Sequence, residues 1–191
     1  MADRRPRVVG VGGTTVSPSS TERALEIALK ACAQRGCETK LFGGAFLSRL
    51  PLYVPKAHTR TPEEALFVEA VRNADGLLIA SPGYHGSISG LVKNALDLLE
   101  ETAGDARAYL SGVPVGLIAT AYGWQATGGT IAALRAITHS LRGWPTPLAA
   151  AVNSAVSRFA DDGACADSAV MQQLALVGGQ VVDFLERPAL A

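Results

Sequence analysis

Five short apolar runs recur along this chain, and the stretches between them place apolar residues at helical spacing. The first run, Arg7–Gly12, shows no polar alternation, which is typical of a strand that a parallel sheet buries on both faces. The predicted strands are Arg7–Gly12, Thr39–Phe42, Gly76–Ala80, Val113–Thr120 and Pro147–Val152. The predicted helices cover residues 24–36, 61–73, 88–99, 130–142 and 170–185. Strict alternation of this kind predicts a doubly wound α/β sheet.

The length and composition suit one domain, because 191 residues at 48% hydrophobic content can build a sizeable core. We expect a single domain over residues 1–191. With five parallel strands, the flavodoxin-like order 2-1-3-4-5 is the natural choice. The segment from Gly43 to Thr61 holds two prolines among apolar residues and is predicted to be an ordered loop. The helix after it begins with Thr61 as a cap and Pro62 in the first turn.

The charge balance argues against several classes of partner. Seventeen basic residues match seventeen acidic ones, and no five-residue run of one sign occurs, so we expect neither nucleic acid nor a membrane surface as a partner. The apolar stretch near the N-terminus is short and broken by glycines, which indicates no signal peptide and a cytoplasmic protein. Three cysteines, Cys32, Cys37 and Cys165, lack metal-ligand or redox spacing, and we expect them to act as small buried hydrophobic residues.

The first predicted strand leads into a loop dense in hydroxyl groups, Gly12–Thr21, which enters the amino end of a helix. Free backbone N–H groups and the helix dipole favour an anion there, such as a phosphate. The loop has no lysine or arginine before Arg23, so it lacks the lysine that a nucleoside triphosphatase needs. We therefore predict a monophosphate held by hydrogen bonds. The alternative is ordinary helix capping by Ser20 or Thr21.

Two further loops follow predicted strands that meet at the same edge of the sheet. Pro82–Ser87 combines flexible glycines with two flat side chains, Tyr84 and His85, and suits a planar ring such as a flavin. Thr120–Thr130 is rich in glycine and contains Tyr122 and Trp124, which could form a wall beside a ligand. Its alternative interpretation is a surface loop with Thr127 as a helix cap.

The constellation contains no Ser-His-Asp order, no paired carboxylates at loop ends and no His/Cys metal cluster. We expect no catalytic side chain and no metal, and a cofactor that carries the chemistry.

The segment Ser81–Asp97, SPGYHGSISGLVKNALD, resembles the NADPH-dependent FMN reductase family, with the Gly128-Gly129 pair as a second anchor. The resemblance covers essentially the whole chain and implies a flavodoxin-like fold that binds FMN together with NADPH or NADH. It implies that Gly13–Thr21 binds the FMN phosphate, that Pro82–Ser87 holds the isoalloxazine, and that the third loop borders the flavin and the nicotinamide. Many relatives carry an arginine in the first loop, where this chain has Thr14, Thr15 and Val16. The implied cofactor-binding residues are Gly13, Thr14, Thr15, Ser19, Ser20, Thr21, Pro82, Gly83, Tyr84, His85, Gly86, Ser87, Tyr122 and Gly123.

The resemblance implies hydride transfer from the nicotinamide to flavin N5, in which reduced FMN could supply a partner monooxygenase. One alternative keeps FMN bound and reduces quinones, azo or nitro compounds or metal oxyanions. Another is a flavodoxin-type electron carrier, which the zero net charge disfavours. His139 lies where similar two-component reductases have a bulged helix at the subunit interface, or else it is an ordinary surface histidine. A homodimer or homotetramer is expected from the family.

Overall fold

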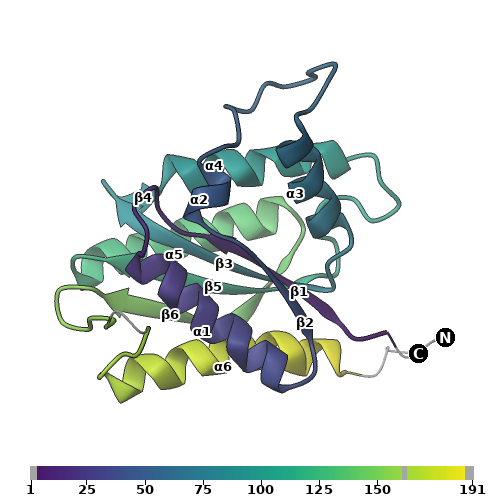
Figure 1. Cartoon of the computed structure of the whole chain (residues 1–191). Coiled ribbons are helices and arrows are strands. Elements are labelled where there is room, and N and C mark those ends of the chain that lie inside the picture. The colour runs from purple at the N-terminus through teal and green to yellow at the C-terminus, as the bar shows by residue number, and fades with distance from the viewer. Residues whose placement is uncertain (1–3, 161–162, 188–191) are drawn as a thin grey trace.

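A parallel sheet forms the centre of the molecule and carries helices on both faces (Figure 1). The structure is a computed structural model that describes residues 4–160 and 163–187. Its elements are β1 (Arg7–Gly12), α1 (Ser20–Gln34), β2 (Glu38–Phe42), α2 (Gly44–Leu47), α3 (Pro62–Arg72), β3 (Gly76–Tyr84), β4 (Ser87–Ile88), α4 (Gly90–Asp97), the 3-10 helix η1 (Leu98–Thr102), β5 (Pro114–Ala121), α5 (Trp124–Ser140), β6 (Trp144–Asn153) and α6 (Ser168–Leu185).

The strand order is β2-β1-β3-β5-β6, and all four pairings along it are parallel. This confirms the flavodoxin-like order expected from the five apolar runs. The sheet contains one more strand than expected, because β4 pairs with the end of β3 in an antiparallel hairpin. A two-residue strand with one apolar side chain has too little periodicity to be found in the sequence.

The apolar runs are continuous because helices bury both faces of the central strands. On one face α1 and α6 pack over Val8, Leu78 and Ile118. On the other face α3, α4 and α5 pack over the alternate side chains of the same strands, such as Leu77 and Leu117. The helices of the two faces are separated by the sheet in Figure 1. The doubly wound prediction is thereby confirmed.

Cys32 and Cys37 lie within the α1 side of the core, as expected of small hydrophobic residues. Burial raises the pKa of the Cys32 thiol to about 12. Cys165 is only half-buried, packed beside the same core. Within the described residues no group of three or more histidine, cysteine or acidic side chains is placed to hold a metal.

The start of α3 follows the sequence prediction closely. Thr61 caps the helix by accepting a hydrogen bond from the Glu64 N–H, and the Glu64 side chain accepts one from the Thr61 N–H. This reciprocal pair is a capping box, with Pro62 at the first helical position. Ser19 caps α1, one residue before the Ser20 or Thr21 that the capping alternative named.

The helix predicted over 130–142 begins six residues earlier, at Trp124, so most of the predicted third loop is helical. Gly128 and Gly129 lie inside α5, and Thr127 is not a cap, since its hydroxyl donates to the Trp124 carbonyl. Glycine favours turns in isolation, and packing on the sheet overrides that preference here. α5 is α-helical through His139, which is exposed, so the bulged-helix hypothesis is wrong for this structure.

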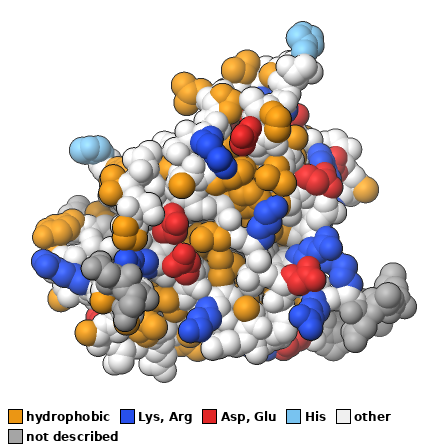
Figure 2. Space-filling view, viewed as in Figure 1, with side chains coloured by type: hydrophobic (Ala, Val, Ile, Leu, Met, Phe, Trp, Pro, Cys, Tyr) orange, Lys and Arg blue, Asp and Glu red, His pale blue; other side chains and the backbone are white. Residues whose placement is uncertain are grey.

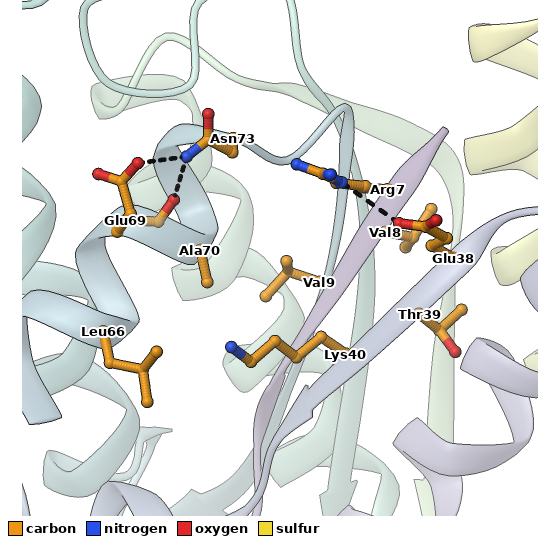
Figure 3. Close-up of a pocket in the computed structure, with 10 residues that line it drawn as sticks. All are labelled: Arg7, Val8, Val9, Glu38, Thr39, Lys40, Leu66, Glu69, Ala70 and Asn73. Atoms are coloured by element: carbon orange, nitrogen blue, oxygen red, sulfur yellow. Dashed lines mark hydrogen bonds and ion pairs between the residues drawn. The ribbon is translucent and has the colours of Figure 1, made fainter. Parts of the chain in front are cut away.

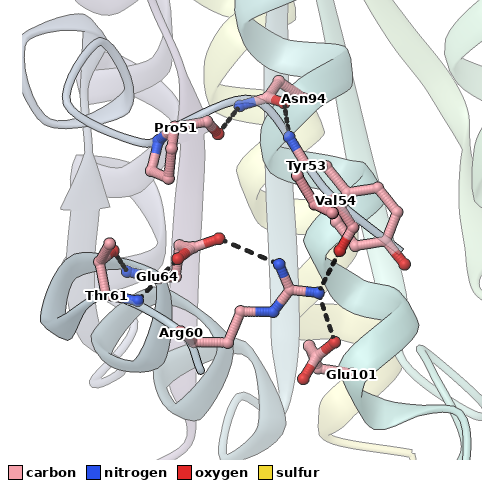
Figure 4. A network of polar contacts seen from close by, with 8 residues as sticks. All are labelled: Pro51, Tyr53, Val54, Arg60, Thr61, Glu64, Asn94 and Glu101. Carbon is pink, nitrogen blue, oxygen red and sulfur yellow. Dashed lines mark hydrogen bonds and ion pairs between the residues drawn. The ribbon is translucent and has the colours of Figure 1, made fainter. Parts of the chain in front are cut away.

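The segment between β2 and α3 is ordered, as predicted, although its first residues form the short helix α2. Its second half is held by side chains (Figure 4). The Asn94 amide accepts from the Tyr53 N–H and donates to the Pro51 carbonyl, each at 2.8 Å. Arg60 donates to the Val54 carbonyl and to Glu101, at 2.9 and 2.8 Å. The segment is thus held by hydrogen bonds to Asn94 of α4 and to Glu101 of η1, while the buried Nε of Arg60 has no partner within the described residues.

The face of the molecule seen in Figure 2 mixes lysine and arginine side chains with aspartate and glutamate, without a large area of one sign. This agrees with the balanced composition. In the part of the chain that the structure describes, no helix combines the length and the apolar character needed to cross a membrane.

Candidate functional site at the carboxyl edge of the sheet

The turns after β1, β3 and β5 meet at one edge of the sheet. The parallel register places Gly12 beside Ala80 and Pro82 beside Thr120, so the three strands end at a similar level. The hydroxyls of Thr21 and Thr120 are 2.5 Å apart in a buried hydrogen bond, which ties the start of α1 to the end of β5. The arrangement places a ligand site at the switch point of a doubly wound sheet, where such sites are expected.

The first loop is clamped onto the turn after β2. A Cβ atom built on Gly44 would lie 1.8 Å from the Thr14 carbonyl oxygen, and one built on Gly13 would lie 2.5 Å from the Gly44 nitrogen. Gly13 also has a φ of 131°, which strains residues with a side chain. The Gly43-Gly44 pair is thus part of the site architecture, and the sequence reading missed it. The only available signal was a pair of glycines directly after a strand.

The beginning of α1 offers unpaired donors. Ser19 uses its hydroxyl to accept from the Glu22 N–H at 3.2 Å, and Arg23 N–H bonds to the Ser19 carbonyl. The backbone N–H groups of Ser20 and Thr21 have no partner among residues 4–160 and 163–187. The Thr21 hydroxyl is committed to Thr120, so Thr21 offers a ligand its N–H alone. Two free N–H groups at the start of a 15-residue helix are suited to binding an anion.

The second turn is a tighter structure than the predicted loop Pro82–Ser87. β3 continues through Pro82 and Gly83 to Tyr84, and β4 begins at Ser87, so the hairpin turn consists of His85 and Gly86 alone. Both turn residues have positive φ, 49° and 89°, as a two-residue hairpin requires. Their backbone N–H groups have no partner in the described part of the chain.

Gly83 was expected to supply backbone freedom, but it lies in a strand and does not have a positive φ. Its role is close packing, because a Cβ there would lie 2.5 Å from the Thr130 hydroxyl on α5. Ser81 supports the hairpin from below: its buried hydroxyl accepts from the Ser89 N–H at 3.0 Å. The hairpin is therefore held against both α4 and α5.

The third turn is Tyr122 and Gly123, directly before α5. Gly123 occupies the N-cap position with a φ of 138°, and no side chain caps the helix. The first N–H groups of α5, on Trp124, Gln125 and Ala126, have no partner within the described ranges. A second helix start with free donors thus faces the same edge as the first.

Large apolar side chains are left exposed around these turns. Tyr122 is 80% exposed, Trp124 61% and Tyr84 52%. Val16 of the first loop and Val156 of the segment after β6 are exposed as well. Apolar groups from four different loops, gathered at a single edge that also carries free donors, are typical of a site that receives a flat ligand.

The segment after β6 was not part of the sequence prediction, yet it borders the same edge. Ser154 donates its N–H and its hydroxyl to the Ala121 carbonyl, at 3.0 and 3.2 Å. Further along, Ser157 donates to Asp167, which caps α6. The Ser157 hydroxyl lowers the pKa of the Asp167 carboxyl below its ordinary value. Serines in a loop give no sequence signal that separates such a role from ordinary solubility.

These residues fit FMN. The free N–H groups of α1 match a phosphate, those of the hairpin and of α5 can donate to polar atoms on a ring edge, and the exposed tyrosines offer a flat apolar surface. The fourteen implied cofactor-binding residues are a prediction.

A different hollow lies at the opposite edge of the sheet (Figure 3). This open groove of about 470 Å³ lies between α3 and the first residues of β1 and β2. Its polar groups are largely bonded to one another: Arg7 to Glu38 at 3.3 Å, and the Asn73 amide to Glu69 at 2.5 Å. Lys40 extends into the groove. In the described part of the chain this groove has volume but lacks free hydrogen-bond donors that converge on one point. The carboxyl edge of the sheet is therefore the better candidate for a ligand site.

Comparison with known proteins places this geometry in context. The family model for NADPH-dependent FMN reductase matches residues 6–157. The chain is 29% identical over 185 residues to an FMN reductase (NADPH) of Escherichia coli (strain K12), covering 95% of this chain and 78% of that protein. It is 37% identical over 97 residues to an FMN-dependent NADPH-azoreductase of Staphylococcus haemolyticus (strain JCSC1435), covering 51% of this chain and 48% of that protein.

Among solved structures, the flavoenzyme NAD(P)H:(acceptor) oxidoreductase FerB from Paracoccus denitrificans superposes with a TM-score of 0.77 at 20% identity. The match covers 95% of this chain and 97% of FerB. At that identity it establishes the shared fold.

Proposed function

The chain belongs to the NADPH-dependent FMN reductase family, and from this premise we propose that it transfers a hydride from NAD(P)H to FMN at the carboxyl edge of its sheet. Family membership makes it an oxidoreductase that uses FMN and a nicotinamide nucleotide. The observation that carries the proposal is the convergence of three turns with unpaired N–H groups and exposed aromatic side chains on one edge. We also propose that residues 1–191 act as one domain.

When bound, FMN supplies a ring that takes up a hydride at N5 from the nicotinamide C4. The protein's share is positioning. The N–H groups of Ser20 and Thr21 would hold the phosphate, with the hydroxyls of Thr15 and Ser20 beside them. The Thr14 hydroxyl donates to the Val16 carbonyl and accepts from the Val16 N–H, so it shapes the loop. The hairpin N–H groups of His85 and Gly86 donate to the ring edge and stabilise negative charge that develops there.

The aromatic side chains complete the site. Tyr84 and Tyr122 pack against the flat ligand and exclude water, and Gly123 lets the backbone approach it. No side chain in this scheme acts as a nucleophile or as a general acid, because hydride transfer needs aligned reactants more than proton transfer.

The test is a spectrum followed by an assay. Purified protein should bind FMN, visible as flavin absorbance or as quenching of flavin fluorescence, and should oxidise NADPH or NADH when FMN is added. Protein that binds no flavin and oxidises neither nucleotide would contradict the proposal. Turnover that depends strictly on free FMN identifies flavin as a dissociable substrate.

The second candidate keeps FMN bound and reduces an azo compound or quinone. The similarity to an azoreductase over 97 residues favours this candidate, as do the exposed aromatic side chains that border the site. Protein that is yellow as purified and reduces quinone or azo dye without added FMN would select this candidate over the first.

A monooxygenase that receives reduced FMN, and assembly as a homodimer or homotetramer, are part of the proposal. Exposed Leu52 and Val54, held beside α4 by the Asn94 hydrogen bonds, support a contact between subunits. Light scattering of the purified protein measures the assembly, and a monomer at micromolar concentration would contradict it.

A further inference from the structure

Glu22 is an acidic side chain that reaches into the architecture of the first loop. It is the third residue of α1, and its N–H is capped by Ser19. Its carboxylate turns toward the turn after β2, where Oε2 accepts a hydrogen bond from the Gly44 N–H at 2.8 Å. A single side chain thereby joins the start of α1 to the glycine pair that clamps the first loop.

The space around this carboxylate admits only glycines. A Cβ atom built on Gly43 would lie 2.8 Å from the Glu22 carboxyl carbon, and one built on Gly13 would lie 2.9 Å from Oε2. Gly44 in turn touches Thr14 of the first loop. The carboxylate is thus wedged among three glycines from two chain segments, and its hydrogen bond fixes how the first loop lies on the turn after β2.

The same carboxylate carries a charge of the wrong sign for a phosphate site. Glu22 directly follows Thr21, whose free N–H the proposed function assigns to the FMN phosphate. It lines a cleft of about 220 Å³ together with Ser17, Pro18 and Ser19 of the first loop, and Arg23 and Glu26 of α1 line the same cleft. Like charges repel, and a partly exposed carboxylate near a phosphate carrying almost two negative charges weakens the hold on that phosphate.

We propose that Glu22 is a positioning residue with two separable effects: its oxygen shapes the first loop, and its negative charge keeps FMN exchangeable. The proposal rests on the proposed function, and it favours FMN as a dissociable substrate over FMN as a permanent group. Glu22→Gln keeps an acceptor oxygen for Gly44 and removes the charge. Glu22→Ala removes both.

The experiment titrates flavin-free protein with FMN and with riboflavin, which lacks the phosphate, and follows the flavin fluorescence. Glu22→Gln should lower the Kd for FMN about fivefold, because it removes a like charge near the phosphate. Its Kd for riboflavin should not change. The difference in Kd for FMN between Glu22→Gln and the wild type should shrink in about 1 M salt, where the Debye length is about 3 Å.

Glu22→Ala should bind FMN about tenfold more weakly than Glu22→Gln. It loses the hydrogen bond from the Gly44 N–H, and the free energy of one such bond corresponds to about a tenfold change in affinity. Its melting temperature without flavin, compared with that of Glu22→Gln, shows that the variant is folded. Glu26→Gln is the matched control: Glu26 lines the same cleft one turn further along α1, and its exposed carboxylate makes no hydrogen bond in the described structure. It should change the Kd for FMN less than twofold.

Two results would overturn the proposal while leaving the proposed function intact. If Glu22→Gln binds FMN no more tightly than the wild type, the charge effect is wrong. If Glu22→Ala binds FMN as tightly as Glu22→Gln, the positioning effect is wrong. Wild-type protein that binds neither flavin overturns the proposed function, and this proposal with it, before any variant is compared.

Discussion

The loops at the carboxyl edge and the segment from Pro51 to Thr61 are both irregular. They differ in how many of their polar groups find hydrogen-bond partners within the protein. In the second segment Arg60 bridges Glu64, Glu101 and the Val54 carbonyl while its guanidinium lies 5.1 Å from the Tyr53 ring centre (Figure 4). At the carboxyl edge the N–H groups of the helix starts and the hairpin turn have no partner among the residues that the structure describes.

This difference separates a structural loop from a site. A buried or half-buried polar group must be satisfied, by the protein itself or by something that binds to it. In the Arg60 segment both terminal nitrogens of the guanidinium are bonded within the protein, although its buried Nε has no partner in the described part of the chain. At the carboxyl edge the groups without a partner among the described residues are the backbone N–H groups of two helix starts and a hairpin turn. The groove of Figure 3 resembles the structural loop, since Arg7 is paired with Glu38 and the Asn73 amide with Glu69, and the Lys40 ammonium lies 4.9 Å from the Phe42 ring centre. The predictions below test whether the two kinds of loop behave separately.

The largest expected effect is on the Arg60 segment. Arg60→Met should lower the free energy of unfolding by about 3 kcal/mol, because it leaves the Glu64 carboxylate, 4% exposed, without its charged partner. Chemical denaturation measures the loss. Arg72→Met is the control, since Arg72 is more exposed in its pairs with Glu69 and Asp105 and should cost less than about 1 kcal/mol. The Kd for FMN should stay within about twofold of the wild-type value. A large loss of FMN affinity in Arg60→Met would break the comparison, because this segment would then belong to the site.

Gly44→Ala should affect both stability and binding. Its new Cβ would collide with the backbone oxygen of Thr14, and overpacking of this kind costs about 2 kcal/mol. The collision displaces the first loop, so FMN should bind at least about tenfold more weakly. Gly90→Ala is the control, because a Cβ on Gly90 meets nothing within 4 Å. Unchanged FMN binding in Gly44→Ala would remove the first loop from the site.

Tyr84→Ala and Tyr122→Ala should show the opposite pattern to Arg60→Met, with weaker FMN binding and little change in stability. Both side chains are exposed, so the free energy of unfolding should change by less than about 0.5 kcal/mol. Loss of a ring surface should weaken FMN binding by about three- to tenfold, measured by fluorescence titration. Leu176→Ala, which removes a similarly exposed side chain from the middle of α6, is the control. Stability losses without a change in FMN affinity would place these tyrosines with the structural loops.

The smallest expected effect concerns the segment after β6, which borders the site but bonds its polar groups internally. The hydrogen bond from Ser157 lowers the pKa of Asp167, so the ionised cap stabilises the fold above the ordinary aspartate pKa of about 3.9. This contribution is lost as the pH falls through the lowered value. Ser157→Ala should raise the Asp167 pKa toward the ordinary value, which NMR titration of the carboxyl group measures. FMN affinity at neutral pH should not change, and if it does, this segment belongs with the site.

The local patterns of the sequence determined the elements of this fold and their order. Strands buried on both faces leave continuous apolar runs, helices leave a period of 3.6, and caps such as Thr61 with Glu64 need only neighbouring residues. The hydroxyl-rich loop after β1 and the Ser81–Asp97 segment could be identified in the sequence for the same reason, because each is a pattern of neighbouring residues. Where the prediction failed, as at the start of α5, packing on the sheet overrode the local preference of Gly128 and Gly129.

The tertiary structure alone decided how the site is assembled. The contact of Glu22 with Gly44 joins residues 22 apart, and the hydrogen bond of Thr21 with Thr120 joins residues 99 apart. The Arg60 network likewise draws on three separate elements. Such contacts depend on where the sheet brings the strand ends together, and no period or spacing along the chain encodes them. Which polar groups remain free for a ligand is known only after the folded chain has bonded all the others, because every buried group first seeks a partner within the protein.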